Sequence, residues 1–203
     1  DLNKAIEINP KDAIAYSNRG VAKGDLGDNQ GAISDYSKAI EIDPQHAEYY
    51  ERRGKLKKRL GDIEEAISDF TMAIEIDPKV ISYYVERGMT RRMLGDMRGA
   101  ISDYKKAILI DPSDPVIYSN RGNARRELGD YQGAIADFNK AIEVDPKFSP
   151  SYFNRGALKE EMRDYQGAID DYNKALEINP KDAIAYYYRG NTRSILRDYQ
   201  GAI

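Results

Sequence analysis

The feature that most constrains this chain is a period of 34 residues that runs from one end to the other. Six prolines, six tyrosines and six glycines each recur at this step. They are Pro10, Pro44, Pro78, Pro112, Pro146 and Pro180, then Tyr16, Tyr50, Tyr84, Tyr118, Tyr152 and Tyr186, and Gly20, Gly54, Gly88, Gly122, Gly156 and Gly190. Such self-similarity is typical of solenoids, in which each unit buries its apolar face against its neighbours. A 34-residue step predicts helix–turn–helix units, and therefore an all-α fold.

The period predicts one continuous array over residues 1–203, because no low-complexity linker or change in composition interrupts it. The expected full repeats are residues 13–46, 47–80, 81–114, 115–148 and 149–182. Residues 1–12 match the end of a repeat, and residues 183–203 match a first helix and the opening of a second. Both segments are therefore expected to be partial repeats.

Each repeat carries its own start and stop signals for two helices. The first helix is expected roughly from Ala13 to Leu26 and at equivalent positions, with aspartate N-caps at Asp12, Asp114 and Asp182. A further aspartate opens every second helix, whose apolar spacing fits one face at 3.6 residues per turn. Glycine ends the first helix in a left-handed turn at Gly27, Gly61, Gly95 and Gly129. Arg163 and Arg197 replace that glycine, at a cost of about 1 kcal/mol each.

The composition excludes several classes of function. The chain has 31 basic and 34 acidic residues, and a net charge of −3 argues against general nucleic-acid or anionic-membrane binding. It has no run of 18 apolar residues and no signal-peptide pattern. It also has no cysteine, which excludes disulfides and thiolate chemistry and fits a cytoplasmic protein.

The repeat resembles the tetratricopeptide (TPR) family over essentially the whole chain. The positions that carry the resemblance are Tyr118, Gly122, Leu128, Gly129, Asp130, Tyr131, Ala134, Phe138, Ala141 and Pro146. Members of this family are right-handed superhelices that hold peptides or partner proteins in a concave groove. The resemblance implies a protein-interaction scaffold with a peptide or protein partner, without catalysis and without a cofactor.

Two columns of cations on the first helices depart from the usual family pattern. The first is Arg19, Arg53, Arg87, Arg121, Arg155 and Arg189, and the second is Lys23, Lys57, Arg91, Arg125, Lys159 and Arg193. One interpretation is a basic ladder for phosphate or an acidic ligand. The favoured one pairs each arginine with an aspartate of the second helix, from the column Asp35, Asp69, Asp103, Asp137 and Asp171. The second column is expected to cover apolar neighbours with its stems and to reach water with its charged heads.

The face opposite the packed arc of the first helices is the expected peptide-binding groove. Its candidate residues are Asn18, Arg52, Lys55, Lys58, Arg59, Arg92, Asn120, Asn123, Phe153, Asn154, Tyr187 and Asn191. An amide both donates and accepts, so the recurring asparagines could bind a peptide backbone of any sequence or simply be solvated. The second full repeat is net basic on this face and the fifth is net acidic. An acidic peptide segment is therefore expected at Arg52, Lys55, Lys58 and Arg59, although a merely solvated mixture of charges remains an alternative.

One known binding mode of the family is not expected here. Some relatives hold a C-terminal carboxylate through a set of lysine, asparagine and arginine residues. The YSNRG segments resemble that subgroup, but the lysine position is filled by Ser17, Glu51, Val85, Ser119, Phe153 and Tyr187. This carboxylate-binding mode is therefore not expected in this chain.

The sequence offers little for an enzyme. His46 is the single histidine and lies in a turn between repeats, so a histidine-rich metal site is excluded. The neighbouring carboxylates Glu64/Glu65 and Glu160/Glu161 diverge on a helix and do not aim at one point. The helical glycines at 31, 99, 133, 167 and 201 lack the strand–loop context of a phosphate cradle.

The alternative function is self-assembly through the ends of the array. Leu2, Ala5 and Ile6 lack their first helix, while Tyr186, Leu196 and Ile203 lack most of their second. Uncovered solenoid ends expose apolar surface, so copies are expected to stack head to tail, and a fragment of a longer array would have the same two ends. An RNA-binding function ranks third, because every candidate stacking ring is already a packing tyrosine.

Overall fold

The computed structural model describes all 203 residues and contains only helices. The sequence-based prediction of an all-α helix–turn–helix fold is confirmed. The helices are α1 (Leu2–Ile8), α2 (Ala13–Asp25), α3 (Asn29–Ile42), α4 (Ala47–Leu60), α5 (Ile63–Ile76), α6 (Ile81–Met93), α7 (Met97–Ile110), α8 (Pro115–Glu127), α9 (Tyr131–Val144), α10 (Ser149–Glu161), α11 (Tyr165–Ile178), α12 (Ala183–Ile195) and α13 (Tyr199–Ala202).

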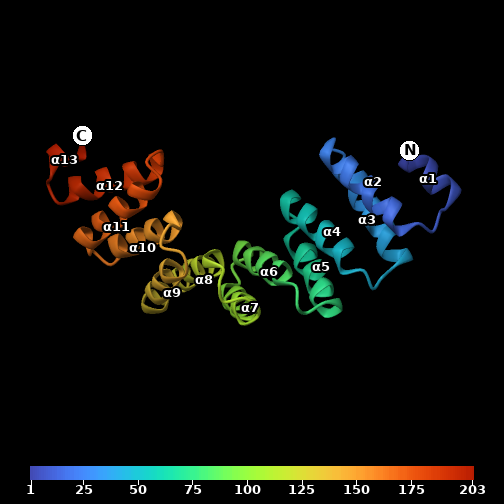
Figure 1. Cartoon of the computed structure of the whole chain (residues 1–203), viewed down its shortest axis with the longest axis horizontal. Coiled ribbons are helices and arrows are strands. Elements are labelled where there is room, and N and C mark those ends of the chain that lie inside the picture. Colours follow the sequence, from blue (N-terminus) through green and yellow to red (C-terminus); the bar gives the residue numbers. More distant parts are fainter. The chain divides into compact units, whose positions relative to one another are not determined.

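The chain divides into two compact units, residues 1–103 and 104–203, and each is described by itself. The even-numbered helices from α2 to α12 are the first helices of the repeats, and the odd-numbered ones are the second helices. Within each unit a first helix packs on the second helix of its own repeat, and that second helix packs on the next first helix. Figure 1 shows this succession as α2, α3, α4 and α5 in one unit and as α8, α9, α10 and α11 in the other.

Glycine opposite an aromatic ring sets the closest approach of the two helices in a repeat. The buried ring is Tyr36, Phe70, Phe138 or Tyr172, on α3, α5, α9 and α11 respectively. A Cβ atom built on Gly122 would lie 2.6 Å from Cε1 of Phe138, and one on Gly20 would lie 2.8 Å from Cε1 of Tyr36. Since real Cβ contacts this short do not occur, the ring fills the space that the missing side chain leaves.

The tyrosine and proline columns meet at the start of each repeat. The hydroxyl of Tyr84 donates to the carbonyl of Pro78 at 3.1 Å, and Tyr50 and Tyr152 donate to Pro44 and Pro146 at 3.3 Å. Each bond ties a first helix to the turn that precedes it. The proline ends the preceding helix because it has no backbone N–H to continue it.

The expected helix starts are confirmed. The aspartate N-caps of the second helices also explain why glycine recurs three residues after them. The carboxylates of Asp28, Asp96, Asp130, Asp164 and Asp198 each accept from the backbone N–H of the glycine three residues on, at 2.9–3.0 Å. A Cβ on Gly133 would lie 2.1 Å from Oδ2 of Asp130. Glu65 stands at this position in the second repeat, and there Asp62 makes no side-chain cap bond.

The expected left-handed turns are also confirmed. Gly27, Gly61, Gly95 and Gly129 have φ angles between 85° and 92°. Arg163 and Arg197 occupy the same turns with φ angles of 64° and 62°. A side chain in this region is strained, so these two turns are intrinsically weaker than the glycine turns.

Candidate binding faces of the first helices

The arginine column of the first helices is bound to the aspartate column of the second helices. Arg19, Arg53, Arg87, Arg121 and Arg155 each form a two-pronged pair with the aspartate 16 residues later, Nε to Oδ2 and Nη2 to Oδ1. For Arg121 and Asp137 the distances are 2.9 and 2.5 Å, and Asp137 is 2% exposed. The predicted ion pairs are confirmed, and the alternative of a basic ladder open to a ligand is wrong.

The second cation column binds the same aspartates. Lys23, Lys57, Arg91, Arg125 and Lys159 lie 2.8–3.0 Å from Oδ2 of the aspartate that already holds the arginine. This ion pair was not predicted for the second column: the side chains keep 17–31% of their surface exposed, and their heads also bind the shared aspartate, since one carboxylate has enough lone pairs to accept from both cations. Burial alone would raise the pKa of Asp35, but hydrogen bonds from Arg19 and Lys23 outweigh it and hold the pKa below its ordinary value.

The arginines also link each repeat to the one before it. Nη1 of Arg53 donates to Oγ of Ser37 at 2.9 Å, and Nη1 of Arg87 donates to Oγ1 of Thr71 at 3.0 Å. Asn3, Asn139 and Asn173 accept the equivalent bonds from Arg19, Arg155 and Arg189. This third partner was not predicted from the sequence. Its signal was a column of short polar side chains at the 34-residue step, interrupted only by Lys105.

The basic set on α4, consisting of Arg52, Lys55, Lys58 and Arg59, is largely neutralised within the chain. Arg52 pairs with Glu48 at 2.6 Å, Lys55 with Glu51 at 2.8 Å, and Lys58 with Glu86 of α6 at 2.5 Å. Arg59 donates to the neutral amide oxygen of Asn29 at 3.2 Å. An acidic ligand would therefore have to compete with carboxylates that are already in place.

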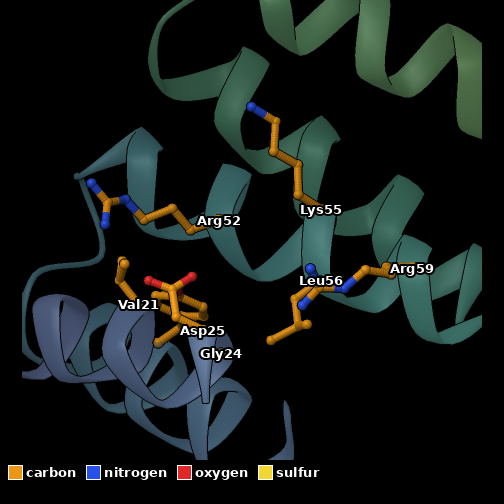
Figure 2. Close-up of a pocket in the computed structure, with 8 residues that line it drawn as sticks. Val21, Gly24, Asp25, Arg52, Lys55, Leu56 and Arg59 are labelled. Atoms are coloured by element: carbon orange, nitrogen blue, oxygen red, sulfur yellow. The ribbon is translucent and has the colours of Figure 1, made fainter. Parts of the chain in front are cut away.

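A small cavity of about 220 Å³ lies between α2 and α4 beside this basic set. Figure 2 shows Asp25 of α2 on one side and Arg52, Leu56 and Arg59 of α4 on the other, while the Lys55 amine points away from the cavity. Val21, Gly24 and Tyr36 complete its walls. Because Arg52 and Lys55 are already paired with Glu48 and Glu51, and Asp25 adds an acid, this cavity has no strong preference for one sign of charge.

The asparagine column is not equivalent from repeat to repeat. Asn18 is exposed, whereas Asn120 and Asn154 are half-buried. The amide of Asn154 donates to Oγ of Ser119 on α8 at 3.1 Å, so one of its hydrogens is used between adjacent first helices. Among the other candidates, Arg92 is half-buried on α6, Asn123 lines a cavity with Arg126 and Glu161, and Asn191 is exposed on α12.

Aromatic side chains gather in the second unit. The aromatic cluster consists of Phe153 of α10, Tyr172 of α11, and Tyr187 and Tyr188 of α12. Ring centroids of Phe153 and Tyr188 lie 5.4 Å apart with edge-to-face geometry, and Tyr187 and Tyr188 lie 5.8 Å apart in the same arrangement. Tyr187 is 65% exposed, so the cluster leaves a ring at the surface.

The cluster borders an acid that the sequence analysis did not single out for binding. Oε2 of Glu160 accepts from the hydroxyl of Tyr172 at 2.9 Å and lies 3.0 Å from Oγ1 of Thr192, whose single hydrogen also has the nearer carbonyl oxygen of Tyr188, at 2.8 Å, as an acceptor. Burial, followed by the bond to Glu160, raises the pKa of Tyr172 far above its ordinary value. From its position in the sequence, Glu160 was expected to be a solvated acid. Only the neighbouring helices bring two hydroxyls to it.

The remaining candidates for chemistry stay at the surface. The His46 ring stacks on Tyr49 at 4.2 Å and lies 3.7 Å from carboxylates of Asp43 and Glu48. No group of three or more histidine, cysteine, aspartate or glutamate side chains could hold a metal ion. None of the helices has the length and apolar character needed to cross a bilayer.

Comparison with protein families matches nearly all of the chain to repeats of one kind. A model described as a tetratricopeptide repeat matches residues 13–46, 115–148 and 149–182. Models with the same description match residues 47–80 and 171–203, and one described as a TPR repeat matches residues 90–125. The comparison with curated proteins gave no match.

Solved structures with this fold include several TPR proteins. YrrB, described as a TPR protein with an unusual peptide-binding site, is 23% identical, with a TM-score of 0.75 over 93% of this chain and 97% of that one. MamA is 26% identical, with a TM-score of 0.76 over 84% and 93% of the two chains. A tetratricopeptide repeat protein from Parabacteroides merdae is 22% identical, with a TM-score of 0.83 over 94% and 75%.

Proposed function

This chain belongs to the tetratricopeptide repeat family, and from that premise we propose that it is a non-catalytic scaffold that binds a peptide or partner protein. The binding surface is the face of the first helices that lies opposite their packed arc. The observation that carries the proposal is the aromatic cluster of the second unit, whose Tyr187 ring is 65% exposed. Aromatic rings and amides at a surface supply large contact area and hydrogen bonds at low entropic cost.

The ion-pair columns support the same binding surface, because they exclude most of the first cation column as a site for a partner. Five of the arginines in the first cation column are each bound to a nearly buried aspartate, so they hold the two helices of a repeat together. They are therefore occupied on the packed side, and what remains for a partner is the varied outer face. One protein of this fold, YrrB, is described as having a peptide-binding site, and that description is compatible with the proposal.

The test is selection of ligands from a peptide library displayed on phage, with the full chain as bait. Selected peptides are then synthesised, and their affinities are measured by fluorescence polarisation. We expect the double variant Asn120→Ala/Asn154→Ala and the variant Tyr187→Ala to weaken binding at least about fivefold, because truncating a side chain that dominates an interface costs more than about 1 kcal/mol. Lys140→Ala, at an exposed site on α9, serves as the control.

Peptides that bind all of these variants with equal affinity would place the binding surface elsewhere. Failure to select any peptide would contradict a peptide-binding scaffold outright.

Self-association is the second candidate, favoured by apolar side chains that are exposed on α12 and α13. Tyr186 is 47% exposed, whereas the equivalent Tyr118 is 5% exposed. Tyr199 adds a further ring that is 62% exposed. A second copy that covered these side chains would form a head-to-tail contact.

A further inference from the structure

A cavity in the second unit combines an acid, aromatic rings and an aliphatic wall. Its volume is about 340 Å³, at the small end of the range for ligand sites, which suits one side chain better than a whole drug-sized molecule. Its walls come from α8, α10, α11 and α12, through Arg126, Glu160, Glu161, Tyr165, Tyr188 and Ile195. We call it the acidic cavity.

The charges around the acidic cavity do not balance. Arg126 and Glu161 form a pair with each other, in which Nε and Nη2 of the arginine both reach the carboxylate. Glu160 has no such cation, since its two partners are the hydroxyls of Tyr172 and Thr192. The cavity therefore carries one uncompensated negative charge, on Glu160.

The hydroxyl of Tyr172 holds the Glu160 carboxylate in place and leaves part of it open. Tyr172 donates to Oε2, and Oγ1 of Thr192 lies near the same oxygen, so Oε1 keeps its lone pairs for another donor. Tyr172 is fully buried, which restricts the position from which it donates. A carboxylate held in this way needs no reordering when a ligand binds, and this lowers the entropic cost of binding.

A cationic side chain on a flexible stem matches each wall of this cavity. An ammonium or guanidinium group would make a charge-assisted hydrogen bond to Oε1 of Glu160. The rings of Tyr165 and Tyr188 can attract the same charge through their faces, and Ile195 can cover the methylene stem. An acidic side chain would instead meet the charge of Glu160 and would have to break the pair of Arg126 with Glu161.

We propose that the acidic cavity takes a lysine or arginine side chain of a bound peptide, and so selects basic residues at one position of the ligand. The inference rests on the proposed scaffold function and adds a specificity to it. It assigns Glu160 as the residue that determines specificity, with Tyr172 as the residue that positions its carboxylate.

The test uses three defined probes that differ at one position. They are the capped peptides Gly-Ser-Leu-X-Leu-Ser-Gly in which X is lysine, acetyl-lysine or glutamate, each titrated into the full chain and followed by NMR. We expect the lysine probe to shift backbone signals of α10 and α12 and to bind about tenfold more tightly than the other two, because hydrogen bonds to charged groups dominate the difference.

Two variants with the same change of net charge give the matched comparison. Glu160→Gln keeps an acceptor oxygen for Tyr172 and Thr192 but removes the charge. Glu143→Gln removes an exposed carboxylate of α9 that does not line the cavity. We expect Glu160→Gln to abolish the preference for lysine and Glu143→Gln to preserve it. A third variant, Tyr188→Leu, retains an apolar wall and should weaken the lysine probe alone.

The outcomes separate this inference from the scaffold function. Equal binding of the lysine and acetyl-lysine probes, no binding of any probe, or an unchanged preference in Glu160→Gln would overturn the inference. Tighter binding of the glutamate probe would show that Arg126 governs the cavity and would also overturn it. In each of these cases the library selection still decides independently whether the first-helix face binds peptides.

Discussion

At the scale of single residues, the most demanding positions are the aspartates of the second helices. Asp35, Asp69, Asp103, Asp137 and Asp171 are each 2–3% exposed. Desolvation of a carboxylate costs several kcal/mol, and two cations with well-formed hydrogen bonds are needed to offset it. The arrangement therefore fixes which helix faces meet, and its main effect is on specificity of packing.

Two neighbouring aspartates on α11, one buried and one exposed, allow the contribution of the buried carboxylate to stability to be measured. Asp171→Asn should lower the free energy of unfolding by about 3–5 kcal/mol, because Arg155 and Lys159 would be left without their shared carboxylate. Asp170→Asn, at the exposed adjacent position, should change it by less than about 0.5 kcal/mol. Urea unfolding followed by circular dichroism at neutral pH measures both, and similar effects for the two variants would contradict this account.

The same carboxylates predict how stability depends on pH. Hydrogen bonds from Arg19 and Lys23 hold the pKa of Asp35 below its ordinary value despite burial. A group whose pKa is lower in the folded state stabilises the fold above its unfolded pKa of about 3.9, and that stability is lost as pH falls through the folded pKa.

We therefore expect the difference in unfolding free energy between the natural chain and Asp35→Asn to be constant from about pH 5 to 8 and to shrink below about pH 4. Urea titrations across this range measure it, with Asp170→Asn as the comparison. If the difference in unfolding free energy instead grew as the pH fell, the prediction would be contradicted.

At the scale of elements, the turns between the two helices of a repeat differ in intrinsic strain. Arg163 adopts a φ of 64° where other repeats carry glycine, and Gly129 adopts 85° one repeat earlier. Arg163→Gly should stabilise the fold by about 0.5–1 kcal/mol, and Gly129→Arg should destabilise it by a similar amount. Thermal unfolding of both variants gives the test, and shifts in the same direction would show that contacts of the side chains outweigh backbone strain.

The crossing of the two helices in a repeat depends on the glycine that faces an aromatic ring. Gly122→Ala places a Cβ against Phe138, which is fully buried and cannot move without disturbing the core, so we expect a cost of about 1–3 kcal/mol. Gly190→Ala is the matched control, because a Cβ there meets only the carbonyl oxygen of Ala202, at 3.4 Å. The latter variant should be neutral or stabilising, since alanine favours helix over glycine. Equal losses of stability would rule out the ring contact as the cause.

At the scale of the whole molecule, the repeats contact only their neighbours, and α12 and α13 carry exposed apolar side chains. Tyr186 is 47% exposed and Tyr199 is 62% exposed. If copies stack head to tail, the mean mass measured by light scattering should rise with protein concentration, and Tyr199→Lys should reduce the rise by placing a charge in the contact. A constant monomer mass up to high concentration would exclude stacking.

The sequence by itself determined what is periodic and local in this protein. Its 34-residue step predicted the all-α fold, and the aspartate and glycine columns predicted helix starts and left-handed turns. It also predicted the pairing of Arg121 with Asp137, because the two residues belong to one repeat and recur together. These features depend on backbone geometry within about one repeat, and the backbone follows sequence rules that hold in every copy.

Only the tertiary structure decided what differs from repeat to repeat. Lys58 pairs with Glu86, Arg126 pairs with Glu161, and Glu160 receives Thr192, all across the boundary between adjacent repeats. Long side chains at such a boundary can reach several partners, and the choice depends on the exact placement of two helices and on their other neighbours. For that reason the predicted basic set on α4 is largely neutralised within the chain, whereas Glu160, which looked like a solvated acid, is left without a cation at the wall of a cavity.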